Sequence, residues 1–348
     1  MSMPPAASGG SMRAIRFEED GAHLIELPRP EPGSEEIVVQ VLAAGVCRTD
    51  LHLLHDVKAG RRKALVPGHE IAGRVVDVGR DVYRVRVGDP VAVHFEQPCG
   101  RCRHCRRKRT NLCEEGHSLG FDLPGGYAEF VRGGQGSVLA LPPEMDLAFA
   151  ATLGCSGATA VHAVVAVGQV QEGDLVAVVG AGGVGLSAVQ VARTHQARVL
   201  AVDLREEARN AAKEVGAERT ASPEEFMDAL RSMAGEAGAD IVVDLVGTAE
   251  SLEQSRKTLG VGGRLVVVAG GDDTIPVSAS GILFGGRAYL GSYSSTMADF
   301  ATALRLAEAG KLRSVVSRRA RLSEAPDILR DLEAGRIVGR AVLEPLRT

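Results

Sequence analysis

The chain has 348 residues, 45% of them hydrophobic, which is enough for two domains with separate cores. Its 40 basic and 44 acidic residues give a net charge of −4, which argues against a general attraction to nucleic acid or to an anionic membrane. Trp is absent and aromatic residues make up only 3%, so stacking on bases is not expected as its main activity.

The first segment, MSMPPAASGGSM, has neither a basic end nor an apolar stretch, so it does not predict a secretion signal. We interpret residues 1–12 as a disordered leader and expect the fold to begin near Arg13. The sequence contains no run of about eighteen apolar residues, so no membrane span is predicted. The expected compartment is the cytoplasm. There, the six cysteines favour metal binding or catalysis over disulfides.

The first part of the chain is strand-like. Val-rich runs at 37–45, 71–79 and 89–95 are separated by Gly, Asp and Pro, a pattern typical of a compact antiparallel, barrel-like domain. A cysteine cluster and a turn leading into a strand at 123–131 follow.

The pattern changes near residue 155. Apolar strands alternate with helices, which indicates a parallel sheet covered on both faces. A further helix at 299–310 leads to a mixed tail. The predicted helices are 157–170, 183–196 and 205–216, and the predicted strands are 174–180, 198–203, 240–247 and 263–270.

The segment VVGAGGVG predicts a dinucleotide site, because it closes an apolar strand and opens a helix. Gly180 would make the tight turn, Gly182 would admit the pyrophosphate, and Gly185 would let helix and strand approach. The cofactor-binding turn includes Gly183 and Val184 as well. Asp203, at the end of the next strand, favours NAD over NADP, whereas the nearby Arg205 weakens that preference.

Four cysteines lie close together with the spacing C-x2-C-x2-C-x7-C. Four thiolates can close a tetrahedron around zinc with no open position, so this pattern predicts a structural site. A nucleic-acid-binding finger and an iron–sulfur cluster are the alternatives. The ligands are Cys99, Cys102, Cys105 and Cys113.

The remaining cysteines are Cys47 and Cys155, and His69 and Glu70 lie between them in the sequence. Two sulfurs and one imidazole nitrogen would form an open catalytic zinc site with a fourth position for water or substrate. The spacing alone does not bring these residues together. Buried cysteines and a histidine satisfied within the core are therefore the alternative.

From Arg13 onward, the chain resembles the zinc-containing medium-chain alcohol dehydrogenases. The resemblance implies an α/β fold with a GroES-like, β-rich catalytic domain and a Rossmann domain, that is, a doubly wound parallel sheet. The expected boundaries are 13–155 for the catalytic domain with a structural zinc lobe at 95–115, 156–292 for the Rossmann NAD-binding domain, and 293–348 for the return to the catalytic domain. The segments that match, in the family's order, are GVCRTDLH, PGHEIAGRVVDVG, the four-cysteine loop, GGYAEF, LGCSGATA, GAGGVG and GRAVL.

The resemblance implies that Cys47, His69 and Cys155 bind a catalytic zinc ion. Glu70 matches a carboxylate that can exchange onto the metal, so it is included among the metal and catalytic residues. Asp50 matches the acid that orients the zinc-bound histidine by a hydrogen bond. A helix N-cap is the alternative role for Asp50.

The resemblance also implies a path for the proton. Thr49 matches the hydroxyl group that takes the alcohol proton, and His52 matches the base that passes it to solvent. Phe95 corresponds to a wall of the substrate pocket. For Phe121, a position in the core is favoured over one in the pocket.

Four more residues match positions near the cofactor. Arg48 and Arg340 correspond to arginines at the pyrophosphate, with a surface ion pair as the alternative for each. Thr159 and Val184 correspond to residues packed on the nicotinamide. The chain lacks the insertion of the longer plant and animal enzymes between Cys113 and Cys155, as do the compact microbial members, so a homotetramer is expected.

We therefore predict an NAD-dependent zinc alcohol dehydrogenase with two Zn²⁺ ions per chain. It would interconvert an alcohol and its aldehyde or ketone by hydride transfer, with a small-molecule substrate, a homo-oligomeric assembly, and no nucleic acid or membrane partner. The alternatives are a non-catalytic protein that binds NAD and zinc, and an NADP-linked reductase of a specialised biosynthetic carbonyl. The substrate itself is not predicted, because discrimination at the level of one methylene is only ~1–3 kcal/mol.

Overall fold

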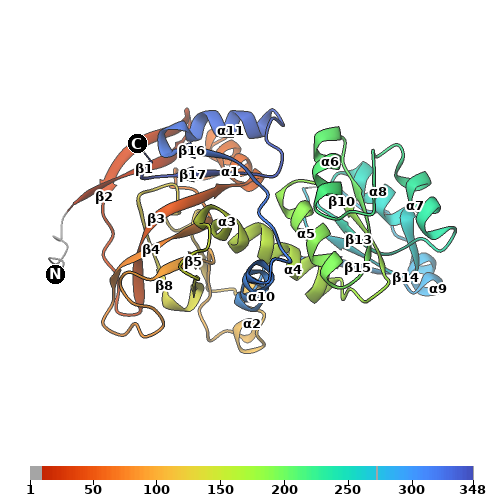
Figure 1. Cartoon of the computed structure of the whole chain (residues 1–348), viewed down its shortest axis with the longest axis horizontal. Coiled ribbons are helices and arrows are strands. Elements are labelled where there is room, and N and C mark those ends of the chain that lie inside the picture. The colour runs from red at the N-terminus through yellow and green to blue at the C-terminus, as the bar shows by residue number, and fades with distance from the viewer. Residues whose placement is uncertain (1–9, 272, 348) are drawn as a thin grey trace. The chain divides into compact units, whose positions relative to one another are not determined.

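The computed structural model describes residues 10–271 and 273–347, and the chain divides into two compact units (Figure 1). The first unit contains the residues up to Gly154 and those from Val316 onward. The second unit contains Cys155–Val315. One unit is therefore inserted into the sequence of the other.

A seven-stranded sheet forms the centre of the first unit, in the order β16-β17-β3-β4-β5-β9, with β8 also paired to β3. All of its strand pairs are antiparallel except β16–β17, as the Val-rich runs predicted. β3 is the longest strand and is buried along most of its length, so the chain on either side of it is firmly positioned. The strands are β3 (Glu36–Val46), β4 (Glu70–Val78), β5 (Pro90–Val93), β8 (Phe130–Gly134), β9 (Val138–Ala140), β16 (Val316–Arg321) and β17 (Arg340–Glu344).

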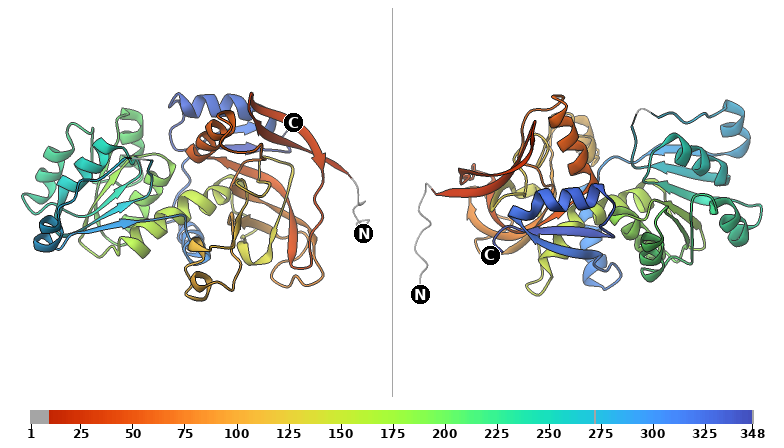
Figure 2. Two further views of the ribbon diagram at one scale, coloured as in Figure 1. Left: turned by 180° about the vertical axis from the view of Figure 1, so that it is seen from behind. Right: turned by 90° about the horizontal axis from the view of Figure 1, so that it is seen from above.

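The beginning and the end of the described chain lie in this same unit, where β1 and α11 appear in red and blue (Figure 2). β1 (Ser11–Glu18) and β2 (Gly21–Pro28) form an antiparallel hairpin. The longer of the remaining elements in this unit are the helices α1 (Arg48–Lys58) and α11 (Ala325–Glu333). The short elements are α2 (Arg103–Arg106), α3 (Leu147–Thr152), β6 (Glu96–Gln97), β7 (His117–Ser118), and the 3₁₀ turns Thr110–Leu112, Gln135–Ser137 and Leu322–Glu324.

The hairpin corrects the predicted start of the fold. Residues 1–9 of the expected leader lie outside the described residues, but Ser11 already begins β1. Met12 pairs with Leu27 and is only 6% exposed. The prediction of a disordered leader that extends to residue 12 is therefore wrong for its last residues, because the apolar Met12 side chain is part of a packed strand.

The second unit contains a six-stranded, wholly parallel sheet in the order β12-β11-β10-β13-β14-β15. Counted from β10, this is the order 3-2-1-4-5-6 of a doubly wound fold, in which ligands bind beyond the carboxyl ends of the strands where the order reverses. That reversal lies between β10 and β13. The strands are β10 (Leu175–Val179), β11 (Arg198–Val202), β12 (Arg219–Ala221), β13 (Ala239–Asp244), β14 (Leu259–Val267) and β15 (Ala288–Gly291).

Helices cover both faces of this sheet (Figures 1 and 2). For that reason every residue of β10 is buried, whereas a strand with one open face would alternate. The predicted run of fully apolar strands is confirmed. The helices are α4 (Ala158–Val161), α5 (Gly183–Thr194), α6 (Glu206–Glu214), α7 (Phe226–Ala234), α8 (Ala249–Thr258), α9 (Ala279–Gly285) and α10 (Met297–Glu308).

The return to the first unit occurs later than the predicted residue 293. Residues 293–315 belong to the second unit, because α10 packs against α4. α10 begins with a capping box in which the Thr296 hydroxyl accepts a hydrogen bond from the Asp299 amide. The chain re-enters the first unit at Val316, where β16 begins.

One helical segment, Leu147–Val167, is long and apolar enough to cross a membrane, although the sequence predicted no such run. It consists of α3, α4 and two π-helical stretches, Leu153–Gly157 and His162–Val167. Of its most apolar window, 78% is buried inside the protein. Burial in the core therefore accounts for its composition.

Candidate functional site

Four side chains with metal-binding atoms meet in one buried cluster. The ligand atoms of Cys47, His69, Glu70 and Cys155 all lie within 4.8 Å of one another. Each of these residues is at most 8% exposed. The structure therefore brings together the residues that spacing alone could not, and two thiols, an imidazole and a carboxylate are a donor set suited to zinc.

Strand ends and helix starts position this cluster. Cys47 directly follows β3 and is the N-cap of α1, whereas Glu70 is the first residue of β4, immediately after His69. Cys155 lies in the π-helical stretch Leu153–Gly157, which continues the helical segment that begins at Leu147 in the first unit. Irregular π turns of this kind often occur at functional sites.

Asp50 connects the start of α1 to His69. Its Oδ2 atom accepts a hydrogen bond from the Cys47 backbone N–H at 2.8 Å and one from the Tyr127 hydroxyl at 2.9 Å. Its Oδ1 atom lies 3.3 Å from His69 Nδ1. Asp50 is thus the third residue of the helix, in a capping box with Cys47, and not the N-cap itself.

The Asp50 carboxylate sets the electrostatics of His69. Burial by itself lowers the pKa of His69, but the charge of Asp50 and hydrogen bonds to Asp50 and Cys47 outweigh it, so the pKa is raised well above its usual value. Because Nδ1 faces Asp50, Nε2 is the nitrogen available to a metal. A carboxylate behind a ligating histidine is the arrangement that fixes its tautomer and orientation.

Glu70 forms a buried ion pair with Arg340. Its Oε1 atom lies 3.0 Å from Arg340 Nη2, and the two side chains are 0% and 5% exposed. Burial raises the pKa of Glu70 to about 7 despite the opposing charge of Arg340. The surface ion pair considered for Arg340 is therefore wrong, because its partner is a carboxylate of the metal-binding cluster.

A glycine makes room for this carboxylate. Gly45 faces Glu70 across the β3–β4 pair, and a Cβ atom added there would lie 2.0 Å from Glu70 Oε2. Any residue other than glycine at position 45 would therefore clash with the Glu70 side chain. No pattern in the sequence indicates this contact, because Gly45 is recognisable only as the end of an apolar run.

Two aromatic rings flank His69. The Phe95 ring lies edge-on to His69 at 5.3 Å between centroids, and the Phe121 ring is tilted at the same distance. The two phenylalanine rings are 5.6 Å apart. Phe121 is only partly buried, so its predicted position in the core is wrong, and it lies beside the cluster as Phe95 does.

The start of α1 also carries the residues predicted to transfer a proton. Thr49 Oγ1 lies 3.6 Å from Cys47 Sγ and is partly buried. His52 is exposed and follows three positions later, so both residues lie on the same face of the helix. Arg48, predicted at the cofactor phosphates, is exposed.

The second group of cysteines forms a small lobe. The Sγ atoms of Cys99, Cys102, Cys105 and Cys113 lie within 4.8 Å of one another, and no disulfide joins any of the six cysteines, all of which are described. Hydrogen bonds from backbone amides lower the pKa of Cys102 to about 6. Burial raises the pKa of Cys105 to about 12. Four converging thiols fit a closed metal site.

Acidic residues pair with arginines of this lobe. Arg101 Nη2 lies 2.9 Å from Glu115 Oε2, and Arg103 Nη2 lies 2.5 Å from Glu114 Oε1. Arg106 donates a hydrogen bond to the Arg101 carbonyl oxygen. These contacts neutralise part of the basic cluster and give no support to nucleic-acid binding.

The glycine motif forms the turn between β10 and α5. Gly180 has φ of +98°, a conformation that favours glycine, and a Cβ atom at Gly185 would lie 1.9 Å from the Gly180 carbonyl oxygen. Nothing lies within 4 Å of a Cβ atom added at Gly182, the N-cap of α5. The turn leaves open space at a helix N-terminus, which is suited to a phosphate group.

Asp203 holds this turn from the end of β11. Its Oδ2 atom accepts a hydrogen bond from the Ala181 backbone N–H at 2.8 Å, and its Oδ1 atom accepts one from the Arg205 N–H at 2.9 Å. Arg205 Nε lies 3.6 Å from Asp203 Oδ1, so the two residues whose charges favour different cofactors form an ion pair. Among the other predicted cofactor residues, Thr159 is buried in α4 and Val184 is partly buried in α5.

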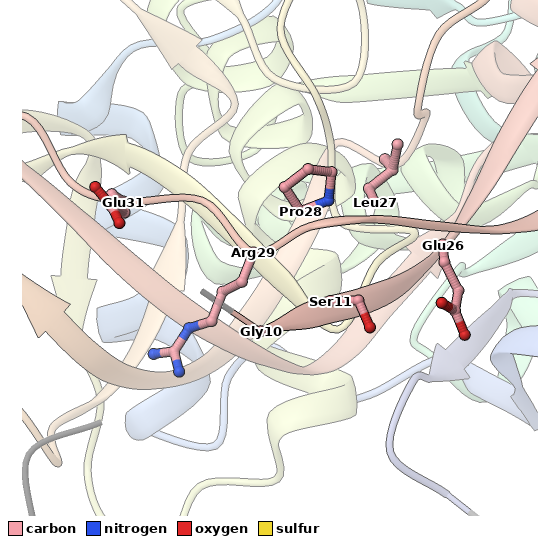
Figure 3. Close-up of a pocket in the computed structure, with 7 residues that line it drawn as sticks. All are labelled: Gly10, Ser11, Glu26, Leu27, Pro28, Arg29 and Glu31. Carbon is pink, nitrogen blue, oxygen red and sulfur yellow. The ribbon is translucent and has the colours of Figure 1, made fainter. Parts of the chain in front are cut away.

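A surface hollow along β1 and β2 contains none of these residues. Its lining residues include Glu26 and Arg29, whose side chains spread apart instead of converging (Figure 3). No histidine or cysteine lines it. The hollow therefore lacks the thiol and imidazole groups of the buried cluster.

Two family models match the two units. A model described as "Alcohol dehydrogenase GroES-like domain" matches residues 33–143, and one described as "Zinc-binding dehydrogenase" matches residues 183–309. An NAD-dependent alcohol dehydrogenase of Sulfurisphaera tokodaii is 33% identical over 347 residues, which cover 96% of this chain and 100% of that relative. The chain belongs to the zinc-containing medium-chain alcohol dehydrogenases.

Solved structures agree with this alcohol dehydrogenase family. The alcohol dehydrogenase of Aeropyrum pernix has a TM-score of 0.89 and 30% identity, covering 96% of this chain and 100% of its own. A zinc-binding dehydrogenase of Sinorhizobium meliloti 1021, solved with NADP, has a TM-score of 0.86 and 29% identity, covering 97% and 100%. The predicted family and fold class are confirmed, and the chain is an oxidoreductase.

Proposed function

We propose that this protein is an NAD-dependent zinc alcohol dehydrogenase. It converts an alcohol to its aldehyde or ketone, and the substrate loses one proton to the protein and one hydride to the cofactor. The observation that carries the proposal is the buried convergence of Cys47, His69, Glu70 and Cys155 within 4.8 Å, in a chain of this family. The reverse reaction reduces a carbonyl by the same path.

Three of these side chains would bind zinc. Cys47, His69 and Cys155 supply two sulfurs and one nitrogen, and this set leaves a fourth position open. A bound zinc ion would act as a Lewis acid that lowers the pKa of an alcohol hydroxyl group toward neutrality. A Glu70 carboxylate oxygen lies within 4.8 Å of the other three ligand atoms, and the pair with Arg340 would stabilise the Glu70 charge when Glu70 does not bind the metal.

The start of α1 would carry the alcohol proton away. Thr49 lies next to Cys47, and its hydroxyl group can both accept and donate a hydrogen bond. His52 is exposed, and an imidazole nitrogen can accept a proton and release it again, so His52 can pass the proton to water. The substrate would lie against Phe95 and Phe121, whose rings flank His69.

The second unit would bind the dinucleotide through its glycine turn. The amides at the start of α5 would hold the phosphates, and the nicotinamide of NAD would accept the hydride. The Asp203 carboxylate favours a ribose 2′-hydroxyl and repels a 2′-phosphate, which supports NAD over NADP. The other cofactor-binding residues proposed are Arg48, Thr159, Gly183, Val184, Arg205 and Arg340.

We propose two zinc ions per chain, the second held by Cys99, Cys102, Cys105 and Cys113. This closed site has no position for substrate, so its metal would stabilise the fold. The unbridged cysteines support a cytoplasmic protein. A homotetramer is proposed as the assembly, and light scattering coupled to size-exclusion chromatography tests it.

The proposal can be tested by measuring the zinc content and the alcohol dehydrogenase activity of the same protein preparation. Purified protein should contain two zinc ions per chain and should reduce NAD in the presence of a panel of primary and secondary alcohols. Cys47→Ala should lose one zinc ion and the activity, whereas Cys102→Ser should lose the other zinc ion and thermal stability first. Full turnover by a Cys47→Ala variant shown to lack that zinc would refute the site.

The same panel separates the alternatives. A protein that binds NAD and zinc but turns over no alcohol or carbonyl is the non-catalytic alternative. A kcat/KM for carbonyl reduction that is higher with NADPH than with NADH would favour the NADP-linked reductase.

A further inference from the structure

Tyr127 is a buried residue that contacts the proposed metal site without belonging to it. Its side chain is 0% exposed, and its hydroxyl group donates a hydrogen bond of 2.9 Å to Asp50 Oδ2. The other oxygen of Asp50 lies 3.3 Å from His69 Nδ1. Phenol, carboxylate and imidazole therefore form a continuous chain that leads toward the proposed metal ligands.

The backbone around Tyr127 is interlocked with the segment before His69. The amides of Gly125, Gly126 and Tyr127 donate hydrogen bonds to the carbonyl groups of Val66, Gly68 and Pro67 respectively, at 2.7–3.0 Å. These three hydrogen bonds join the GGY and PGHE segments of the sequence. The phenol is thus fixed to the same piece of chain that carries the histidine.

The Tyr127 ring also packs on the backbone itself. A Cβ atom added at Gly68 would lie 2.3 Å from Tyr127 Cδ1, and Gly68 has φ of +95°. Only a glycine directly before His69 admits the ring at this distance. The ring has no room to turn away from Asp50, so its hydroxyl group is held in place.

We propose that Tyr127 is a positioning residue for the metal site, because its hydroxyl group holds the Asp50 carboxylate in the orientation that presents His69 Nε2 to the metal. This inference rests on the proposed function. With donors from both Tyr127 and Cys47 on Oδ2, the carboxylate cannot rotate without breaking a buried hydrogen bond. Its Oδ1 atom therefore stays on the imidazole.

A phenol suits this position for an electrostatic reason. The cluster contains two cysteines and one carboxylate, and Asp50 adds a second carboxylate beside it, so a neutral donor stabilises Asp50 without adding a further charge. Burial raises the pKa of Tyr127 well above its usual value, and the charge of Asp50 raises it further, so the phenol keeps its proton. Its hydroxyl group donates to Asp50 within a network of buried polar groups.

Replacing Tyr127 by phenylalanine removes the hydroxyl group and keeps the ring. In Tyr127→Phe, we expect loss of the catalytic-site metal to a chelator to be ~10-fold faster, at the lower end of the effect of outer-shell partners. With cobalt in the site, the visible absorption bands should shift, because the imidazole is held less firmly. Tyr83→Phe, which changes an exposed phenol, is the control and should match the wild type.

The outcomes distinguish this inference from the proposed function. A wild-type protein that takes up no cobalt in the cluster refutes the metal site, and the inference with it. A different result is that the wild type shows the normal cobalt bands while Tyr127→Phe shows the same bands and the same rate of metal loss. That result refutes only the inference, whatever the melting temperature of the variant. Phe226→Leu, a core change in the second unit, controls for lower stability and should alter neither readout.

A second measurement does not require the Tyr127 variant to fold. The chain has four tyrosines, so changing Tyr83, Tyr289 and Tyr293 to phenylalanine leaves Tyr127 alone to carry 3-fluorotyrosine. Its ¹⁹F NMR signal should move when a chelator removes the cluster metal, because Asp50 and His69 transmit the change. A signal that stays in place would overturn the inference.

Discussion

Changing Gly45 to alanine tests whether the packing around Glu70 is as tight as the structure indicates. The added Cβ atom would lie 2.0 Å from Glu70 Oε2 and 2.8 Å from Glu70 Cβ. Rotation of the carboxylate relieves the first clash but not the second, so β3 and β4 must also move apart. We expect the displaced carboxylate to lose its pair with Arg340.

The expected loss of stability is large. Breaking a buried ion pair costs roughly 3–5 kcal/mol. The lower conformational entropy of unfolded alanine offsets only ~0.4–1 kcal/mol of this. The free energy of unfolding of Gly45→Ala should therefore fall by about 3 kcal/mol. At ~2–4 °C for each kcal/mol, this corresponds to a fall in Tm of roughly 6–12 °C.

Gly133→Ala is a matched control for this change. Gly133 is also a buried glycine in a strand, β8, but its nearest atom would be Leu119 Cδ1 at an ordinary contact distance of 3.5 Å. We expect this variant to be as stable as the wild type or slightly more so. Urea unfolding of both metal-loaded variants, followed by circular dichroism, measures the difference. Equal stability of Gly45→Ala and Gly133→Ala would refute the reasoning.

Three further predictions concern other parts of the chain. Burial by itself raises the pKa of Asp299, but hydrogen bonds with His162 and Thr296 lower it below its usual value. The stabilisation is therefore present above the unfolded pKa and is lost as pH falls through the folded pKa. Asp299→Asn should lower the free energy of unfolding by about 1.5 kcal/mol at pH ~6, and the difference should shrink below pH ~4 in urea titrations; a constant difference would contradict this. Asp203→Asn should move the ratio of kcat/KM for NAD and NADP about tenfold toward NADP, a change of ~1.4 kcal/mol; an unchanged ratio would show that Asp203 does not select the cofactor. Phe121→Ala should change the relative kcat/KM for bulky and small alcohols by ~1–3 kcal/mol with full zinc content; an unchanged substrate profile would place Phe121 outside the pocket.

The sequence alone determined the features that depend on neighbouring residues. The Rossmann strands were predictable because a strand covered on both faces must be apolar at every position, as β10 is. The glycine turn was predictable because its chemistry lies within a few residues of Gly180. Short spacing likewise marked Cys99, Cys102, Cys105 and Cys113 as a group.

Only the tertiary structure decided the contacts between distant residues. Tyr127 reaches Asp50 across 77 positions of sequence, and Arg340 reaches Glu70 from the last strand of the chain. The role of Gly45 depends on Glu70, which faces it across the β3–β4 pair. The role of Phe121 depends on its position beside His69. Hydrophobic periodicity shows whether a residue is buried, but it does not show what the residue lies against. That partner is set by the register of the strands and by the path of the loops between them.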